Sequence, residues 1–357
     1  MKKILHTLHL YLGLLSGIVI FTVAITGCIV AFEEELRAYS YSELFEVTKG
    51  NNRLSLDELK LKAIESHPNE GIKSIRILKD ETASVEIQFQ DRLSVFVDPY
   101  SGKILGSLNR GKDFYGKVLR LHRNLMLDDA GEWITGISAL VFFFMIISGI
   151  ILWWPTNKRI RKEKLVIKRK THWIKMNYDL HSVLGFYASW MILFTVLTAL
   201  IWSFEWAEQG MFALTNSTKE KRMEITSNGK KDSTELSLST VYLSSIELYP
   251  ESSELIMFLP EDEKGSIRTM HRYNSGFFKR QDNVFYDQYT GEIIKDKPFD
   301  SFSTGMKLRI SNENIHTGRA FGLVGRWIVF FASLICASLP ITGFLIWNNK
   351  RKMAKQL

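Results

Sequence analysis

Residues 121–155 read LHRNLMLDDAGEWITGISALVFFFMIISGIILWWP, and residues 315–347 read IHTGRAFGLVGRWIVFFASLICASLPITGFLIW. In both stretches a histidine precedes a long apolar run, and two glycines and two tryptophans follow it at offsets of 9, 11, 27 and 31 residues. The matched residues are Gly131, Trp133, Gly149 and Trp153 after His122, and Gly325, Trp327, Gly343 and Trp347 after His316. Agreement at every offset indicates that one transmembrane pattern occurs twice in this chain.

A second pair of segments repeats in the same way. Leu8-His9 is followed by Gly13 and Thr26, and Leu180-His181 by Gly185 and Thr198, at offsets of 4 and 17. Residues 95–104 also match residues 284–293, and each reads as a strand, a turn around Asp and Gly, and the start of another strand. The unit of helix, external segment and helix therefore occurs twice in the same direction, as in bundles built from parallel repeats.

Four stretches of the 357-residue chain are almost purely apolar, at about residues 10–32, 134–154, 183–204 and 321–347. Each is long enough to cross a bilayer, which takes about 20 residues. The first is interpreted as a retained helix rather than a signal peptide, because it runs too long and no small-residue cleavage site precedes Glu33-Glu34-Glu35. The chain is thus predicted to be a multi-pass membrane protein.

The formal charge of +8 is concentrated beside these spans. Residues 158–175 hold nine Lys or Arg against Glu163 alone, and four more basic residues follow the last span. Because Lys and Arg in short loops beside membrane helices stay cytoplasmic, this pattern indicates topology rather than binding to nucleic acid. Both termini and the middle loop are predicted to be cytoplasmic, and the segments 33–131 and 205–320 external.

The external segments read as small α+β domains. In the first, Ser55 and Glu58 form a capping box, and the helix that follows should stop before Pro68. Alternating or β-branched apolar residues predict strands at 72–78, 84–90 and 93–97. The second segment shows a weaker helix pattern at 236–248, with strands predicted at 255–259, 267–273 and 283–286.

Six of the eight histidines lie at or near the ends of the spans, and only His67 and His271 lie within the external segments. Ionisable residues at such places are costly and are candidates for function. On the predicted topology His6, His9, His172 and His181 are cytoplasmic, whereas His122 and His316 are external.

A bis-histidine haem needs two neutral imidazoles from different helices. The repeat-related pairs His9/His181 and His122/His316 meet that need, and two stacked haems would form an electron path across the bilayer. Interface histidines and another metal are the alternatives, although zinc and copper sites usually gather three or more ligands. The sequence leaves open whether His6 replaces His9, or His172 replaces His181.

Other residues bear on the same hypothesis. No Cys-x-x-Cys-His occurs, so a haem would be of the b type, and Cys28 and Cys336 give neither a disulfide framework nor a metal-site spacing. Arg123 and Arg319, beside the external histidines, are candidate partners for haem propionates or for phospholipid headgroups. No nucleotide-binding or catalytic motif occurs, so no catalytic residue is assigned and the electron donor must come from elsewhere, such as a membrane quinol or a cytoplasmic reductase.

These residues together resemble the bacterial PepSY-associated transmembrane helix family, which includes iron-regulated membrane proteins. The resemblance rests on Leu8-His9, Leu121-His122-Arg123, Ser148–Pro155, Leu180-His181, Ile315–Gly318 and Thr342–Trp347, with residues 95–104 and 284–293 similar to the last strands of PepSY modules. It implies a bacterial inner-membrane protein with two periplasmic domains, and some members are haem-containing reductases that deliver electrons to ferric siderophores. Carried over, His9, His122, His181 and His316 would ligate the haem iron.

The expected fold is a four-transmembrane-helix bundle built from two repeats, with two small α+β periplasmic PepSY-like domains. Its order is transmembrane helix 1 (1–32), PepSY-like domain 1 (33–118), a haem-ligand segment with transmembrane helix 2 (119–155), a basic cytoplasmic loop (156–180), transmembrane helix 3 (181–204), PepSY-like domain 2 (205–310), and a haem-ligand segment with transmembrane helix 4 and a basic tail (311–357). The expected function is a di-haem b oxidoreductase that reduces a periplasmic acceptor, with ferric siderophore as the leading substrate. The alternative is a membrane-anchored binding or regulatory protein without redox activity.

Overall fold

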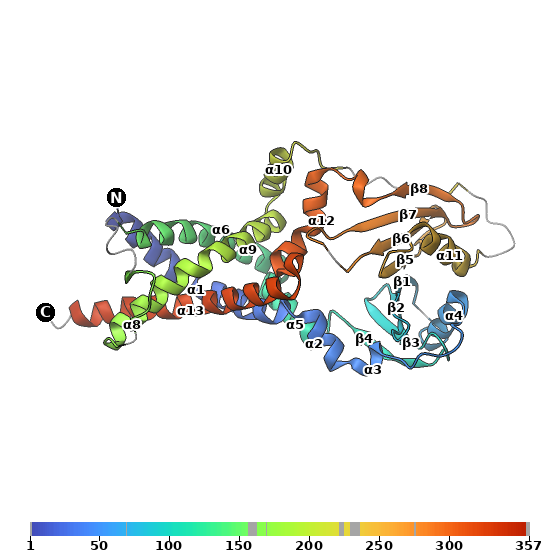
Figure 1. The fold of residues 1–357 in the computed structure, drawn as a ribbon, viewed down its shortest axis with the longest axis horizontal. Helices are drawn as coiled ribbons and strands as arrows, with labels where there is room; N and C mark the ends of the chain where they lie inside the picture. The colour runs from blue at the N-terminus through green and yellow to red at the C-terminus, as the bar shows by residue number, and fades with distance from the viewer. Residues whose placement is uncertain are drawn as a thin grey trace. The chain divides into compact units, whose positions relative to one another are not determined.

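The computed structural model describes residues 2–354 apart from 69, 156–162, 169, 221–224, 229–235 and 275. The chain forms two compact units, each built from both halves of the sequence (Figure 1). The membrane unit comprises Met1–Glu33, Lys117–Leu214 and Asn312–Leu357. The sheet unit comprises Glu34–Gly116 and Thr215–Ser311.

Within the described residues, four helical segments are long and apolar enough to cross a membrane: Lys2–Val30, Asp128–Trp153, Trp173–Ser203 and Arg319–Ala354. They confirm the four predicted spans. Their outward surfaces are apolar, and Leu15 and Ile18 of the first span are 84% and 82% exposed. Such exposure of large aliphatic side chains suits a helix that meets lipid rather than water.

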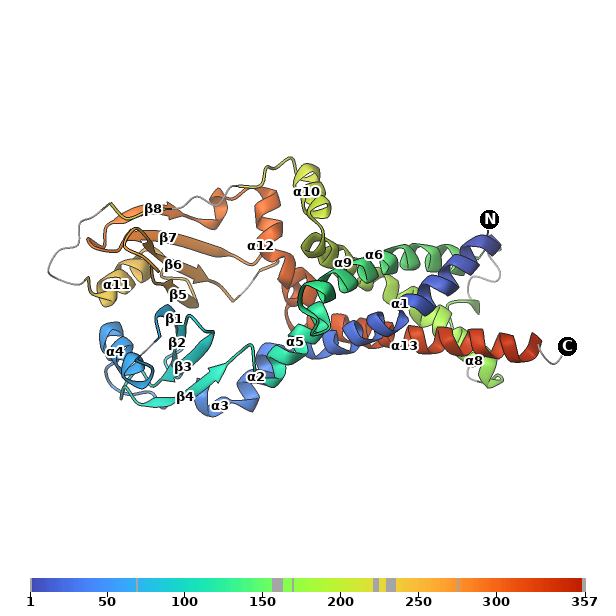
Figure 2. The same cartoon turned by 180° about the vertical axis from the view of Figure 1, so that it is seen from behind.

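The spans contain the long helices α1 (Lys2–Val30), α6 (Asp128–Trp153), α9 (Gly185–Ser203) and α13 (Gly322–Ala354). Helix α1 contacts α6 and α13, and α9 contacts the same two helices, so the four form a closed ring. The start of α1 and the end of α13 lie at one end of this unit, here called the terminal end (Figure 1 and Figure 2). The buried middle of the ring is rich in small residues such as Ala24, Ala188 and Ala337, which let helices approach closely.

Shorter helices at the ends of the ring were not predicted. Helix α8 (Trp173–Asp179) and the π-helical turn η1 (Leu180–Leu184) precede α9 directly. Residues 173–180, expected in the basic loop, therefore extend the third span, and residues 156–162 and 169 of that loop lie outside the described residues. Helices α5 (Phe114–Asn124), α10 (Glu205–Leu214) and α12 (Thr304–Thr317) and the 3-10 turn η3 (Arg319–Phe321) border the spans at the other end.

Helix α10 also moves a predicted boundary. The sequence placed residues 205–214 at the start of the second external domain, whereas they belong to the membrane unit. Phe204, between α9 and α10, contacts the rings of Trp133 and Trp206. These aromatic contacts tie the segment to α6, which explains why the compact unit extends past the end of the span.

The sheet unit differs from the two separate domains that were expected. The described strands form one eight-stranded antiparallel sheet in the order β4-β3-β2-β1-β5-β6-β7-β8. The strands are β1 (Ile72–Leu78), β2 (Val85–Phe89), β3 (Leu93–Val97), β4 (Ile104–Asn109), β5 (Glu254–Phe258), β6 (Ser266–Arg272), β7 (Gln281–Asp287) and β8 (Ile293–Lys297). Strands β1 and β5 pair from Ser74↔Phe258 to Leu78↔Glu254 and join the halves. The join removes the open edge that each half would otherwise present to solvent.

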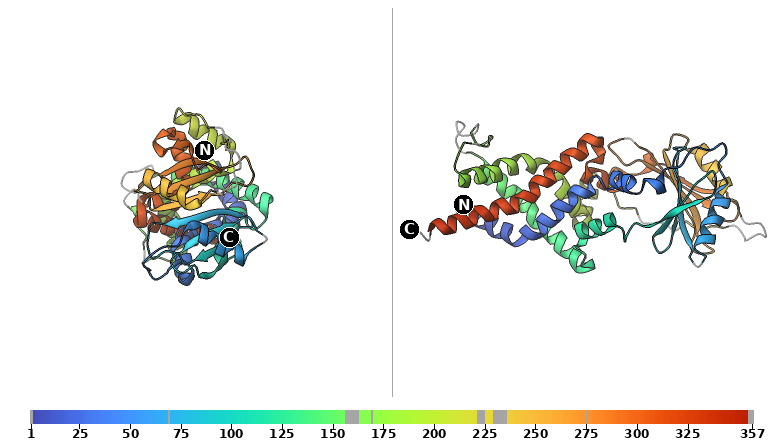
Figure 3. Two further views of the ribbon diagram at one scale, coloured as in Figure 1. Left: turned by 90° about the vertical axis from the view of Figure 1, so that its right-hand side faces the viewer. Right: turned by 90° about the horizontal axis from the view of Figure 1, so that it is seen from below.

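The predicted strands and helices of this unit are otherwise confirmed. Helix α4 (Leu56–Ser66) begins after the Ser55–Glu58 capping box, and α11 (Leu238–Leu248) is its counterpart in the second half. Both helices cover the same face of the sheet (Figure 3). Two short helices, α2 (Glu33–Ser40) and α3 (Ser42–Phe45), were not predicted.

The helix-covered face is the hydrophobic core of the sheet unit. Ile75, Ile87 and Met257 are fully buried there, beneath Leu59 of α4 and Val241 of α11. Alternate residues along each strand point to this face, as the period of a strand requires.

His271 of β6 lies among these core strands. Its Nε2 is 2.8 Å from the Ser245 hydroxyl and its Nδ1 is 3.0 Å from the Ser252 hydroxyl. Burial lowers the pKa of His271 to about 4, so this imidazole is neutral and satisfied within the core. It is therefore a structural histidine of the sheet unit.

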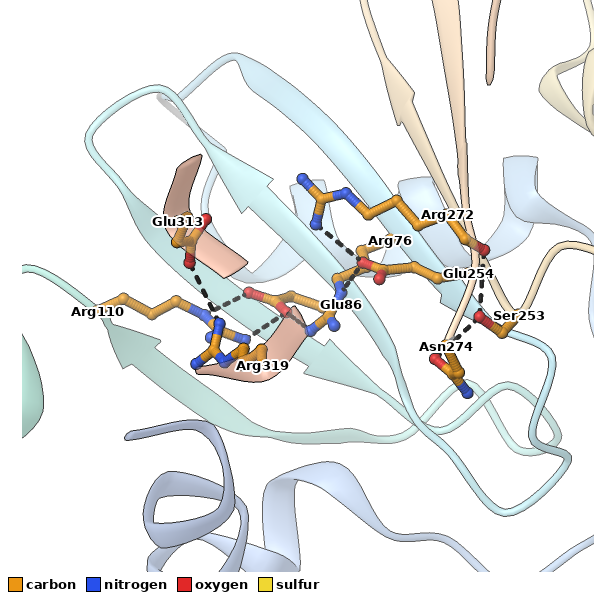
Figure 4. Close-up of polar contacts among 9 residues, drawn as sticks. All are labelled: Arg76, Glu86, Arg110, Ser253, Glu254, Arg272, Asn274, Glu313 and Arg319. Atoms are coloured by element: carbon orange, nitrogen blue, oxygen red, sulfur yellow. Dashed lines mark hydrogen bonds and ion pairs between the residues drawn. The ribbon is translucent and has the colours of Figure 1, made fainter. Parts of the chain in front are cut away.

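The opposite face of the sheet carries a chain of ion pairs that runs Arg110–Glu86–Arg76–Glu254–Arg272 (Figure 4). Arg110 donates two hydrogen bonds to the carboxylate of Glu86, from Nε to Oε1 at 2.9 Å and from Nη2 to Oε2 at 2.7 Å. Burial alone would raise the pKa of Glu86, but Arg110 and Arg76 hold it below its usual value. Because Arg76 lies on β1 and Glu254 on β5, the 2.6 Å bond between them reinforces the join of the two halves.

Helices α4 and α11 are also coupled through a shared cap. The Ser237 side chain makes no cap bond of its own, and the backbone N–H groups of Leu238 and Ser239 donate instead to the carboxylate of Asp57 in α4, at 2.9 and 3.3 Å. In return, the Ser239 hydroxyl accepts the backbone N–H of Leu56 at 3.0 Å. The carboxylate thus satisfies donors that the start of a helix leaves open.

Replacing Asp57 with Ala should expose the first turn of α11 and cost about 1–2 kcal/mol, the usual cost of a lost helix cap. Hydrogen exchange in the full-length protein should show faster exchange over the start of α11. Asp80→Ala is the matched control, because Asp80 caps only its own turn at Thr82. Equal exchange over α11 in both variants would show that the shared cap contributes little.

Candidate functional site

The structure brings His122 and His316 together at the end of the membrane unit opposite the terminal end. His122 lies near the end of α5 and His316 near the end of α12. Their ring centroids are 6.1 Å apart and their planes meet at 72°. Two imidazole nitrogens that each lie about 2 Å from one metal ion place the ring centroids about 6 Å apart, so this spacing suits a shared metal.

The Nδ1 atoms of this pair are already engaged. His122 Nδ1 lies 2.9 Å from the carbonyl oxygen of Val23 and 3.2 Å from the Thr26 hydroxyl. His316 Nδ1 lies 2.8 Å from the Thr198 hydroxyl. A carbonyl oxygen only accepts, so His122 must carry its proton on Nδ1.

The hydroxyl groups lead to the same conclusion. Thr26 donates its proton to Thr22 O at 2.7 Å, and Thr198 donates to Thr195 O at 2.8 Å, each within its own helix. Each hydroxyl oxygen is then left to accept from the imidazole Nδ1–H. Within the described part of the chain, the Nε2 atoms of His122 and His316 have no hydrogen-bond partner and keep their lone pairs for a metal.

The second pair, His9 and His181, repeats this arrangement at the terminal end. His9 Nδ1 lies 2.8 Å from the Ser148 hydroxyl of α6, and His181 Nδ1 lies 2.9 Å from the Thr342 hydroxyl of α13. Ser148 donates its own proton to Met145 O at 3.0 Å, and Thr342 donates to Ser338 O at 3.0 Å. The Nδ1–H tautomer therefore applies to all four predicted ligands.

His9 and His181 line one cavity of about 430 Å³. This volume lies in the range of small-molecule and cofactor pockets, about 300–1,000 Å³. The wall is mainly apolar, with Phe186, Leu339 and Trp347 among its residues. Four lysines (Lys164, Lys168, Lys175 and Lys350) and two acidic residues (Glu163 and Asp179) also line it, and Lys168 pairs with Glu163 at 2.7 Å. An apolar wall beside several cations suits a flat hydrophobic group that carries carboxylates.

A glycine of a neighbouring helix packs against each imidazole of the His9/His181 pair. A Cβ added to Gly149 would meet His9 Cε1 at 3.4 Å, and one added to Gly343 would meet His181 Cε1 at 3.3 Å. Gly149 and Gly343 occupy the offset of 27 in the sequence repeat, which therefore marks the positions that give these rings room. Gly13 and Gly185 line the cavity and also pack against Met145 and Leu339 of neighbouring helices.

The alternative histidines occupy different surroundings. His6 is exposed at the cavity wall, and its Nε2 lies 3.5 Å from Lys350 Nζ. His172 is exposed and caps the start of α8, where its Nδ1 accepts the Ile174 N–H at 3.4 Å. Neither has the helix hydroxyl that holds His9 and His181, so the structure favours His9 and His181 as the paired positions.

The two predicted arginines differ. Arg123 is exposed beside His122. Arg319 pairs with Glu313 at 3.2 Å, and both residues belong to the membrane unit. Arg319 thus has an acidic partner that the sequence analysis did not foresee.

The distance between the two sites follows from the helix geometry. Along α1, 17 residues separate His9 from Thr26, which supports His122. At 1.5 Å per residue this is about 25 Å. It is close to the hydrocarbon thickness of a bilayer, about 30 Å, so the sites lie near opposite membrane surfaces.

The donor set fits a bis-histidine haem. Each site offers two imidazoles whose Nδ1 atoms are engaged and whose Nε2 atoms are available, held by partners of the kind that orient metal-bound histidines. In the described ranges, no group of three or more His, Cys, Asp or Glu side chains is placed to hold a metal ion. The supporting hydroxyls of Ser148 and Thr342 were quoted in the sequence motifs and Thr26 and Thr198 in the repeat, but their role became visible only in three dimensions.

The family model described as the PepSY-associated TM region matches residues 6–350. This match covers both histidine pairs, the sheet unit and nearly all of the four spans, so the chain belongs to the PepSY-associated TM family. No curated protein matches the chain significantly.

The hydrogen bonds predict the protonation of the imidazoles. NMR of the ¹⁵N-histidine-labelled protein, prepared without added metal or cofactor, should show Nδ1 protonated and Nε2 bare in His9, His122, His181 and His316. Thr198→Val removes the hydroxyl acceptor of His316 and of no other histidine, so only the His316 resonance should move. An Nε2–H tautomer at His122 would contradict the geometry, because Val23 O cannot donate.

Proposed function

We propose that this protein is an inner-membrane oxidoreductase that holds two b-type haems and passes electrons across the membrane to a periplasmic acceptor. The observation that carries the proposal is the pair of imidazoles at each end of the membrane unit, each with Nδ1 engaged and Nε2 available. A membrane anchor has no need for matched imidazole pairs on both surfaces. Bound haem would supply one-electron chemistry, with iron alternating between the ferric and ferrous states.

The residues of this chain have distinct parts in the proposal. His9 and His181 would hold one group, and His122 and His316 the other. The hydroxyls of Ser148, Thr342, Thr26 and Thr198 fix the rings and increase the basicity of Nε2 by accepting the Nδ1–H. Among the cations of the His9/His181 cavity, Lys175 and Lys350 would pair with propionates there, since Lys168 is paired with Glu163 and Lys164 donates to the Trp153 carbonyl.

The direction of transfer follows from charge. Lys164, Lys168, Lys175 and Lys350 lie at the terminal end with His9 and His181, and basic residues beside spans favour the cytoplasmic side. We propose that electrons enter on that side from a quinol or a cytoplasmic reductase, since no nucleotide-binding motif was found in the sequence. Ferric siderophore as the acceptor rests on the family resemblance and on the need for a substrate that takes one electron per iron.

The competing function is a membrane-anchored binding or regulatory protein. The continuous sheet and its ion-pair face favour this reading, because they offer a large folded surface that electron transfer does not itself require. The two functions differ in one respect that is easily measured. Only the oxidoreductase depends on the paired histidines.

Purified wild-type protein should show a reduced low-spin b-type haem spectrum at about two haems per chain. His316→Ala and His181→Ala should each remove one haem, because each deletes one of two axial ligands. His6→Ala and His172→Ala are the matched controls and should retain both haems. Unchanged haem content in His316→Ala, or a colourless wild-type protein despite ample haem supply, would sink the assignment.

Transfer across the membrane can be measured with full-length protein in vesicles that enclose dithionite, with a ferric hydroxamate chelate and a ferrous-iron indicator outside. Each iron should accept one electron and give an indicator signal well above that of protein-free vesicles. His181→Ala and His316→Ala should both fall to the protein-free rate, since each interrupts one site. Wild-type rates in both variants would favour the binding or regulatory function.

A further inference from the structure

An asparagine precedes the second-half histidine by four residues at both sites. Asn177 precedes His181, and Asn312 precedes His316. The Asn177 side-chain amide donates to Thr342 O at 3.1 Å, and that of Asn312 donates to Thr198 O at 3.0 Å. Thr342 and Thr198 are the residues whose hydroxyls bind the two imidazoles. The same four-residue arrangement thus occurs twice, at opposite ends of the membrane unit.

These amides are deeply buried. Asn177 is 1% exposed and Asn312 is 2% exposed. Burying an amide costs several kcal/mol unless hydrogen bonds compensate, about 2–7 kcal/mol by most reference states. The nitrogen of each amide donates to a carbonyl of a neighbouring helix, whereas the buried Asn177 Oδ1 has no hydrogen-bond partner among the described residues. The placement indicates a role that a leucine of similar size would not fill.

Each asparagine and the histidine that follows it contact one threonine of a neighbouring helix at two atoms. Residues four apart lie on the same face of a helix, one turn above the other. Asn312 therefore bonds to the backbone carbonyl of Thr198, and His316 bonds to the hydroxyl of the same residue from the same side. Such a contact fixes both the rotation and the axial position of α12 against α9. Asn177 and His181 do the same for the α8–η1 segment against α13.

The first-half histidines lack this contact. The residue four before His9 is Leu5, and the residue four before His122 is Val118. His122 relies on the carbonyl of Val23 as well as on Thr26. Each imidazole pair consequently joins one ligand held by an asparagine to one that is not.

We propose that Asn177 and Asn312 are positioning residues for the axial imidazoles of His181 and His316. The inference rests on the proposed function, because it assigns these residues to haem ligation. By holding Thr342 and Thr198 in place, the asparagines keep the Nδ1–H bond of each ligand aligned and its ring plane fixed. Loss of the amide weakens that bond and makes Nε2 a poorer donor to ferric iron.

The test compares Asn312→Leu with Asn177→Leu in the full-length protein, and each variant is the matched control for the other. Asn312→Leu should lower haem affinity at the His122/His316 site about 10- to 100-fold, the usual effect of losing an outer partner of a metal ligand. It should also make the midpoint potential of that haem more positive and change its electron paramagnetic resonance spectrum. The His9/His181 haem should stay unchanged, which also shows that the variant is folded. Asn177→Leu should reverse the pattern.

A double-mutant cycle separates positioning from general packing. If Asn312 acts through Thr198, the shift in potential from Asn312→Leu should largely disappear in a Thr198→Val background. Additive shifts, equal shifts of both haems in either single variant, or no shift at all would overturn the inference.

A measurement without haem distinguishes this inference from the proposed function. In ¹⁵N NMR of the haem-free protein, Asn312→Leu should move the His316 Nδ1 resonance and leave that of His9 unchanged. If wild-type protein binds no haem but this resonance moves, the oxidoreductase proposal fails while the positioning of His316 stands. If the protein binds two haems and the resonance does not move, the positioning role is wrong.

Discussion

The membrane unit depends on one kind of hydrogen bond, from an imidazole Nδ1–H to an oxygen on a neighbouring helix. The acceptor hydroxyls lie on transmembrane helices and already donate to their own backbones, so they are left with only lone pairs to offer. This constraint sets the tautomer, directs Nε2 away from the supporting helix and gives a polar side chain a partner within apolar surroundings. Gly149 and Gly343 leave room for the rings of His9 and His181 that this bond orients.

The spans and the paired histidines could be predicted because both are visible as patterns in the linear sequence. A run of apolar residues is visible without a structure, and so is a histidine repeated at a fixed offset. The supporting residues were harder to recognise. Ser148 is a small polar residue in an apolar helix, and small residues also occur in such helices simply because they allow close packing. Its meaning depends on His9, 139 residues away along the chain.

The sheet unit shows a different limit. The alternation of apolar and polar residues predicted the positions of β1 and β5 to within a residue or two. The residues of these strands do not indicate, however, that the two strands pair with each other. Edge pairing depends on backbone groups that every residue carries, so it leaves little trace in side-chain patterns. The ion pair between Arg76 and Glu254 links the two strands, but Arg and Glu are common on protein surfaces, so neither residue indicated this contact in the sequence. The boundary at α10 was missed for a related reason, since aromatic contacts at Phe204 determine it.

The β1–β5 join has a consequence for how the two halves of the chain depend on each other. Each histidine is supported by a residue of its own half of the chain, whereas each imidazole pair and the central strand pairing combine one partner from each half. A half-length chain would therefore contain every supporting contact but lack a second imidazole and leave a strand edge bare. Two copies related by a twofold axis would repair both defects at once. Both the sheet and the imidazole sites are therefore completed only by pairing between the two halves of the chain, whereas the buried asparagines beside the ligands belong to the second half alone.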